Sequence, residues 1–225
     1  SKGVSIIMTN EDIVLSIETL KEYTSGMIKK CQEAVLLSVE SMVNRNLEQA
    51  KRIMENDDDI DLLREYIRDR SVELMASKHP MIKDLRYIYV LSDISTELER
   101  IGDYAVNICK EIVAIGENEY IKELIDIPRM SEMCSKMLEA LNEAFLNEDD
   151  ELAYQIALTD RELDKLYSKI REDSLKVMYR DPESNISQGV RLLFIGRYLE
   201  RIGDHITNIC EKIIYAKKGT MVEIG

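Results

Sequence analysis

The chain has 225 residues, of which 45% are apolar, enough to bury a substantial core. Nine glycines and three prolines leave few residues for the tight turns of a sheet, so the composition favours helices. The formal net charge of −13 repels phosphate backbones and makes a nucleic-acid partner unfavourable, whereas it suits metal cations or basic protein surfaces.

Apolar residues recur at steps of three and four through most of the chain, which is the periodicity of helices packed in a bundle. The sequence predicts six long helices with short connections, at residues 9–44, 47–78, 81–117, 128–147, 150–180 and 185–218. Short links between long helices favour antiparallel neighbours. The predicted fold class is therefore all-α, with two tandem and similar three-helix bundles.

Prolines and polar residues mark the ends of these helices. The dipeptides at 79–80 and 181–182 are predicted to end the second and fifth helices, because proline disfavours helix at the residue before it. A third proline, Pro128, lies in the first turn of the fourth helix. We place the first bundle at residues 8–125 and the second at 126–220.

The compartment is predicted from what the sequence does not contain. It has no apolar run of the roughly 18–20 residues needed to cross a bilayer, and no signal-peptide pattern at its N-terminus. Its four cysteines are typical of reduced thiols, with Cys109 and Cys210 placed among apolar neighbours as small core residues. We therefore expect a cytoplasmic protein.

One polar pattern occurs twice. Glu-Arg-Ile-Gly-Asp followed by Asn-Ile-Cys spans residues 99–109 and recurs at 200–210. The pair Asp57 and Asp61 recurs in the same way as Asp160 and Asp164. Each half of the chain is about a hundred residues long, a normal domain size. The chain is therefore a tandem duplication, and the shared polar residues are its candidate functional site.

These shared residues are spaced by four, which places them on one face of each helix. If neighbouring helices lie alongside, each half gathers four carboxylates and one amide oxygen, a ligand set that suits hard or borderline cations. The candidate metal ligands are Asp57, Asp61, Glu99, Asp103 and Asn107 in the first half and Asp160, Asp164, Glu200, Asp204 and Asn208 in the second.

A glycine precedes the last aspartate of each pattern. Within a helix, Gly102 and Gly203 each cost about 1 kcal/mol relative to alanine, so a close approach of a second helix is the natural compensation. The alternative to a metal site is a solvated acidic face, with Arg100 and Arg201 as surface ion-pair partners.

The remaining chemistry-bearing residues give little indication of catalysis. His79 and His205 are predicted to be surface residues, and His205 has Tyr104 as its counterpart, so it cannot be a ligand that both halves require. The sequence contains no glycine-rich phosphate loop, nucleophile elbow, H-E-x-x-H or C-x-x-C pattern. We therefore expect no catalytic residues and no enzyme activity.

Residues 97–103 and 198–205 resemble the paired signature of the PhoU family, and Asp84-Leu85-Arg86 resembles that family's Asp-Leu-Arg element. The resemblance extends over nearly the whole chain, to Lys218. One departure is that residues 185–187 of the second half read Asn-Ile-Ser where the first half has Asp-Leu-Arg.

The resemblance implies a cytosolic negative regulator of phosphate uptake and phosphate-starvation signalling. Its implied partners are the ATPase subunit of the phosphate ABC transporter and a phosphate sensor histidine kinase, and we expect a homodimer. The family's metal motif, an acidic residue with Asp four positions on, implies multivalent metal ions such as iron, zinc, nickel or another divalent cation. That motif falls on Asp57 and Asp61, Glu99 and Asp103, Asp160 and Asp164, and Glu200 and Asp204.

Two other functions compete with this one. A PhoU-type domain could regulate a sodium–phosphate carrier, in which case the chain would continue into apolar membrane spans. A carboxylate-bridged metal pair could also serve an oxidoreductase. Enzymes of that kind use Glu-x-x-His pairs from their helices, and the sequence has none.

Overall fold

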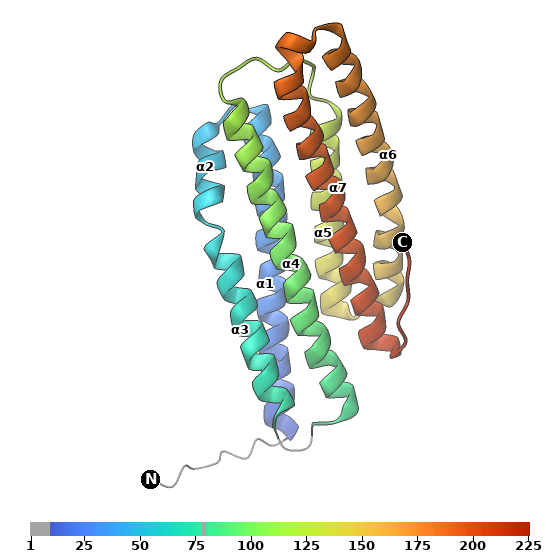
Figure 1. Cartoon of the computed structure of the whole chain (residues 1–225). Coiled ribbons are helices and arrows are strands. Elements are labelled where there is room, and N and C mark those ends of the chain that lie inside the picture. Colours follow the sequence, from blue (N-terminus) through green and yellow to red (C-terminus); the bar gives the residue numbers. More distant parts are fainter. Residues whose placement is uncertain (1–9, 78–79) are drawn as a thin grey trace.

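The computed structural model describes residues 10–77 and 80–225, and these residues fold into helices joined by short connections (Figure 1). The prediction of an all-α fold is confirmed. His79 and residues 1–9 lie outside the described ranges. The helices are α1 (Asn10–Val43), α2 (Leu47–Glu55), α3 (Asp58–Met75), α4 (Ile82–Ile115), α5 (Asp126–Asn147), α6 (Asp150–Arg180) and α7 (Pro182–Lys218).

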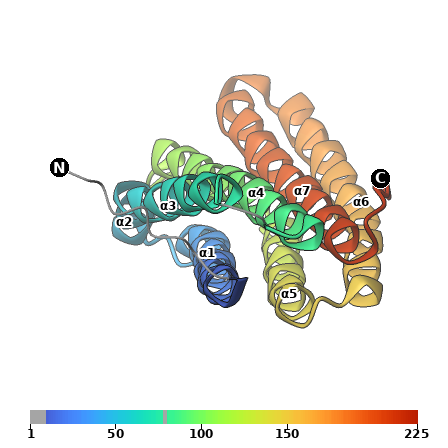
Figure 2. The same cartoon turned by 90° about the horizontal axis from the view of Figure 1, so that it is seen from below.

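The helices form two groups, α1 to α4 and α5 to α7, which are seen end-on in Figure 2. Helix α4 packs against α7 and α1 packs against α5, so the two groups share one continuous apolar core. Where they meet, α4 and α7 run antiparallel (Figure 1). The division of the chain at residues 125 and 126 stays a prediction.

The second predicted helix, 47–78, is wrong in two respects: it is two helices, α2 and α3, and α3 ends at Met75. The interruption falls at Asn56 and Asp57, the start of an Asn-Asp-Asp-Asp run. Asparagine and aspartate are poor residues within a helix, and adjacent carboxylates repel. At the beginning of α3 the same carboxylates meet the positive end of the helix dipole, which stabilises them. The equivalent part of α6 has Thr159 and Asp160 and is unbroken.

The other helix ends lie close to the predicted positions. Asp181 ends α6 and also caps α7, where its carboxylate accepts a hydrogen bond from the Ser184 N–H. Because Pro182 is the first residue of α7, that helix begins three residues before the predicted 185. Across residues 10–77 and 80–225, no helix combines the length and apolar character needed to cross a membrane.

Candidate metal centre

The structure brings three aspartates together in each half. In the first cluster, Asp57, the residue just before α3, and Asp61 of α3 face Asp103 of α4. In the second cluster, Asp160, Asp164 and Asp204 come from α6 and α7. Within each cluster, one carboxylate oxygen from every aspartate lies within 4.8 Å of the others. Six of the ten predicted ligands therefore converge in the two sites.

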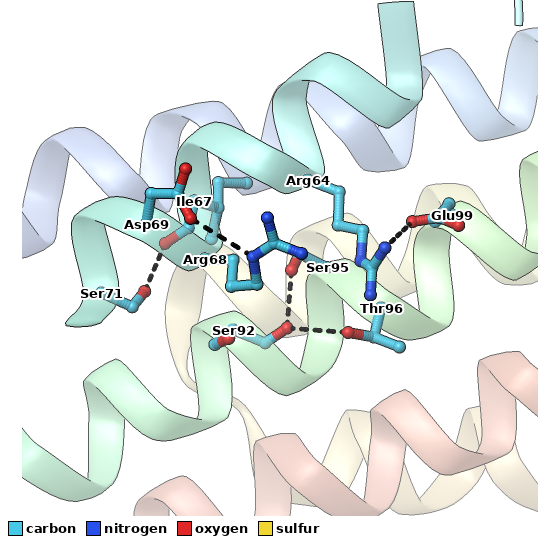
Figure 3. Close-up of polar contacts among 9 residues, drawn as sticks. All are labelled: Arg64, Ile67, Arg68, Asp69, Ser71, Ser92, Ser95, Thr96 and Glu99. Atoms are coloured by element: carbon cyan, nitrogen blue, oxygen red, sulfur yellow. Dashed lines mark hydrogen bonds and ion pairs between the residues drawn. The ribbon is translucent and has the colours of Figure 1, made fainter. Parts of the chain in front are cut away.

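Two predicted ligands, Glu99 and Glu200, lie beside these clusters, and each is paired with an arginine. The Arg64 Nη1 atom is 2.7 Å from the Glu99 Oε2 atom across α3 and α4 (Figure 3). In the second half, Arg197 pairs with Glu200 on α7 itself. The repeat gives no sign of these arginines, because they come from different places in the two halves. The spacing of Arg197 and Glu200 by three was a signal that could have been used.

Around Arg64, the nearby hydroxyl groups are bonded within their own helices (Figure 3). Ser95 and Thr96 donate to the Ser92 carbonyl of α4, and Ser71 donates to the Ile67 carbonyl of α3. The ion pair of Arg64 with Glu99 is therefore the polar link between α3 and α4 in this view. It places a positive charge beside the first cluster.

The two predicted amide ligands are placed differently from the aspartates. Asn208 directs its amide nitrogen to the Glu97 Oε2 atom of α4, at 3.3 Å, in the contact between the two halves. The ligand roles of Asn208 and of Asn107 stay predictions.

His205 is not the surface residue that the sequence predicted. Its side chain is only 13% exposed, and its Nδ1 atom is 2.5 Å from the Glu97 Oε2 atom. Burial alone would raise the pKa of Glu97, but the hydrogen bonds from His205 and Asn208, with the Lys212 charge, lower it overall. Within the described residues, neither aspartate cluster contains a histidine.

The solvated-face alternative assigned Arg100 and Arg201 to ion pairs with the acidic pattern. Arg201 instead donates to the Tyr104 hydroxyl, at 3.2 Å. The cysteines are as predicted: all four are buried and free. Burial raises the pKa of the Cys109 thiol to about 12, so this sulfur stays protonated at neutral pH and is a poor metal ligand.

The predicted close approach at the glycines is confirmed, and it is tighter in the second half. A Cβ atom on Gly203 would lie 2.4 Å from the Asp160 Oδ1 atom and 2.6 Å from the Leu163 Cδ1 atom. A Cβ atom on Gly102 would lie 3.0 Å from the Ile60 Cδ1 atom. Because Gly203 has no side chain, Asp160 can approach α7 closely enough to join the second cluster.

The carboxylates of the first cluster are close together and partly removed from solvent. Burial, followed by the charges of Asp57, Glu99 and Asp61, raises the pKa of Asp103 to about 6. The Arg64 guanidinium opposes this effect without cancelling it. Lowering the charge density of the site, by a proton or a cation, is therefore favourable.

The second cluster shows the same effect more strongly. Burial, followed by the charges of Asp164, Asp204 and Glu200, raises the pKa of Asp160 to about 7. The Asp160 Oδ1 atom is buried and has no hydrogen-bond partner among the described residues. Burial is also the largest cause of the raised pKa values of Asp57, Asp61, Glu200 and Asp204.

These observations fit a bound cation. Three convergent carboxylates supply hard oxygen ligands, and an unpartnered buried oxygen gains a partner. The aspartates would hold the ion, while Glu99 and Glu200 lie close enough to add to its negative surroundings. A bound multivalent cation would supply a fixed positive charge that joins α3 to α4 and α6 to α7.

Replacing Asp103 and Asp204 together by asparagine should remove most of the bound metal, because the two changes together take one charged ligand from each cluster. Elemental analysis of the purified variant measures this. Circular dichroism should show an unchanged helix content, since neither side chain belongs to the apolar core. An unaltered metal content would contradict the assignment of the clusters.

An all-α chain made of two similar halves, each with a cluster of three aspartates between its last two long helices, defines a duplicated acidic helical bundle. The PhoU domain matches this chain twice, over residues 24–112 and 127–213. The chain therefore belongs to the PhoU domain family.

Named relatives and a solved structure agree with this family assignment. A PhoU homolog 1 of Thermotoga maritima, described as a phosphate-specific transport system accessory protein, is 35% identical over 89% of this chain and 86% of its own. A homolog with the same description from Clostridium acetobutylicum is 30% identical over 97% of this chain and all of its own. The crystal structure of the phosphate transport system regulatory protein PhoU from Streptococcus pneumoniae covers 94% of this chain and 99% of that one, with a TM-score of 0.87 and 26% identity.

Proposed function

We propose that this protein is a cytoplasmic negative regulator of phosphate uptake and of the response to phosphate starvation. In this role it is a metal-binding adaptor, without turnover of its own, on the ATPase subunit of the phosphate ABC transporter and on its linked sensor histidine kinase. Its relatives are described as accessory proteins of phosphate-specific transport, which supports the general role.

The observation that carries the adaptor proposal is the pair of aspartate clusters. In each cluster the carboxylates are partly buried and repel one another, an effect that a bound cation would relieve. Each cluster lies between two long helices. We propose that multivalent cations bind there and hold the helix pairs in the arrangement that a partner recognises. Electrostatic complementarity between such a surface and a partner would govern the choice of partner and the rate of association. A homodimer is part of the same proposal.

Two measurements test the proposed function. Deleting the gene should leave the phosphate-uptake and starvation-response genes expressed when phosphate is plentiful, because the restraint is lost. The purified protein should bind the purified ATPase subunit or the cytoplasmic part of the sensor kinase in isothermal titration calorimetry. Normal repression in the deletion strain, together with no binding to either partner, would rule the proposal out.

A further inference from the structure

The interruption between α2 and α3 lies beside a cavity that the duplicated sequence does not predict. This cavity has a volume of about 210 Å³ and is bounded by α1, α2, α3 and α4. Its floor is apolar and includes Leu37, Ile53 and Ile60. Small-molecule sites of drug size have volumes of roughly 300–1,000 Å³, so this cavity is suited to a single large side chain.

The cavity belongs to the first half because of local sequence. Helix α2 ends at Glu55 and α3 begins at Asp58, so the chain leaves the helical path at Asn56, a residue that lines the cavity. In the second half, α6 passes the equivalent point without a break and lies against Gly203 more closely than α3 lies against Gly102. The two halves therefore present different surfaces to a partner.

The rim of the cavity is acidic. Glu33, Asp57 and Asp59 line it, and Lys30 is the one positive side chain that the described residues contribute to the lining. Lys30 is 3.9 Å from Asp59, and both side chains are well exposed, so their attraction is weak. An additional positive charge at this rim is favourable. The net charge of −13 attracts a basic partner to the surface as a whole.

We propose that this cavity is a docking site for an arginine side chain of the partner protein, which would make the first half the partner-binding half. An arginine has a long apolar stem that would lie against Leu37, Ile53 and Ile60. Its guanidinium would reach the Glu33 and Asp59 carboxylates, which are outside the first cluster. Arginine is also weakly hydrated and frequent among the residues that dominate protein interfaces. The proposal rests on the proposed function only for the identity of the partner.

The first test compares two charge reversals at equivalent positions of α3 and α6. Asp59→Lys changes the rim of the cavity, and Glu162→Lys makes the same change in charge where α6 is continuous. We expect Asp59→Lys to weaken binding of the purified ATPase subunit at least tenfold, measured by calorimetry on protein with its metal bound. Glu162→Lys should change it less than threefold. Ile53→Phe, which fills the floor without changing charge, should weaken binding as Asp59→Lys does.

The second test needs no transporter. In ¹H–¹⁵N NMR spectra, N-acetyl-arginine methylamide should shift the amide signals of Ile53 and Asn56, whereas N-acetyl-norleucine methylamide should not. Shifts at these residues without binding of the ATPase subunit would support the cavity and contradict that subunit as the partner. Absence of the shifts, or equal weakening by Asp59→Lys and Glu162→Lys, would overturn the docking site.

Discussion

Replacing Gly203 by alanine should lower the free energy of unfolding by about 1–2 kcal/mol, although alanine is the better helix former by about 1 kcal/mol. The added methyl group would lie 2.4 Å from the Asp160 Oδ1 atom and 2.6 Å from the Leu163 Cδ1 atom. Leu163 is fully buried, so it can move only by disturbing its neighbours. Asp160 must also move, which takes its carboxylate away from the second cluster.

Gly102→Ala is the matched comparison. There the nearest atom to the new methyl group is the Ile60 Cδ1 atom, at 3.0 Å, and Asp57 is 3.9 Å away. A shift of a few tenths of an ångström at the end of the Ile60 side chain relieves the contact. The better helix propensity of alanine should then offset the cost, leaving a net change within about 0.5 kcal/mol.

Urea denaturation of the two metal-free variants measures these changes, and elemental analysis reports the metal bound to each. Gly203→Ala should lose metal from the second half, while Gly102→Ala should keep its full content. Equal losses of stability in the two variants would show that the difference in helix approach between the halves has no energetic consequence.

Much of this fold could be predicted from periodicity alone. Apolar residues at steps of three and four determined which faces of the helices are buried, and prolines and capping residues marked most of the ends. The break at Asn56 and Asp57 could not be predicted in this way, because its acidic residues were interpreted as part of a ligand pattern. Their low helix propensity and mutual repulsion are the stronger influence at that point.

A spacing of four residues predicted the candidate site well when it was applied once. The prediction was less complete where a second step of four was added. A helix has 3.6 residues per turn, so each step of four rotates a side chain by about 40°. From Glu200 to Asn208 the rotation is therefore about 80°, and the Asn208 amide meets Glu97 of α4. Arg64 could not be predicted for another reason. Its partner Glu99 is on a different helix, and no spacing in the sequence relates the two residues.

The metal-free protein should become more stable as the pH falls from 8 to about 5. The raised pKa of Asp160, about 7 against an ordinary value of 3.8, means that the folded protein holds a proton which the unfolded chain has released. A group raised in this way contributes stability at low pH and loses it as the pH rises through the folded-state pKa. Asp103, with a pKa of about 6, acts in the same direction. Thermal unfolding in chelator-containing buffers across this range measures the effect.

Asp160→Asn assigns that dependence to one residue. At pH 8 the substitution removes a carboxylate that its neighbours repel and whose buried Oδ1 atom has no hydrogen-bond partner among the described residues. It should therefore raise the stability of the metal-free protein by about 1 kcal/mol once partial solvent screening is allowed for. At pH 5 the folded wild-type carboxyl is protonated while the unfolded one is still ionised, so the variant should keep only a small part of its advantage. Glu172→Gln, which breaks an exposed ion pair with Lys176 on the same helix, is the control and should change stability by less than about 0.5 kcal/mol at either pH.

With metal present, the order of stability of the wild type and Asp160→Asn at pH 8 should reverse, because the carboxylate that destabilises the empty cluster is the one that a cation needs. A variant that is less stable than the wild type at pH 8 even in chelator would show that the three carboxylates of the second cluster do not repel one another enough to require a cation.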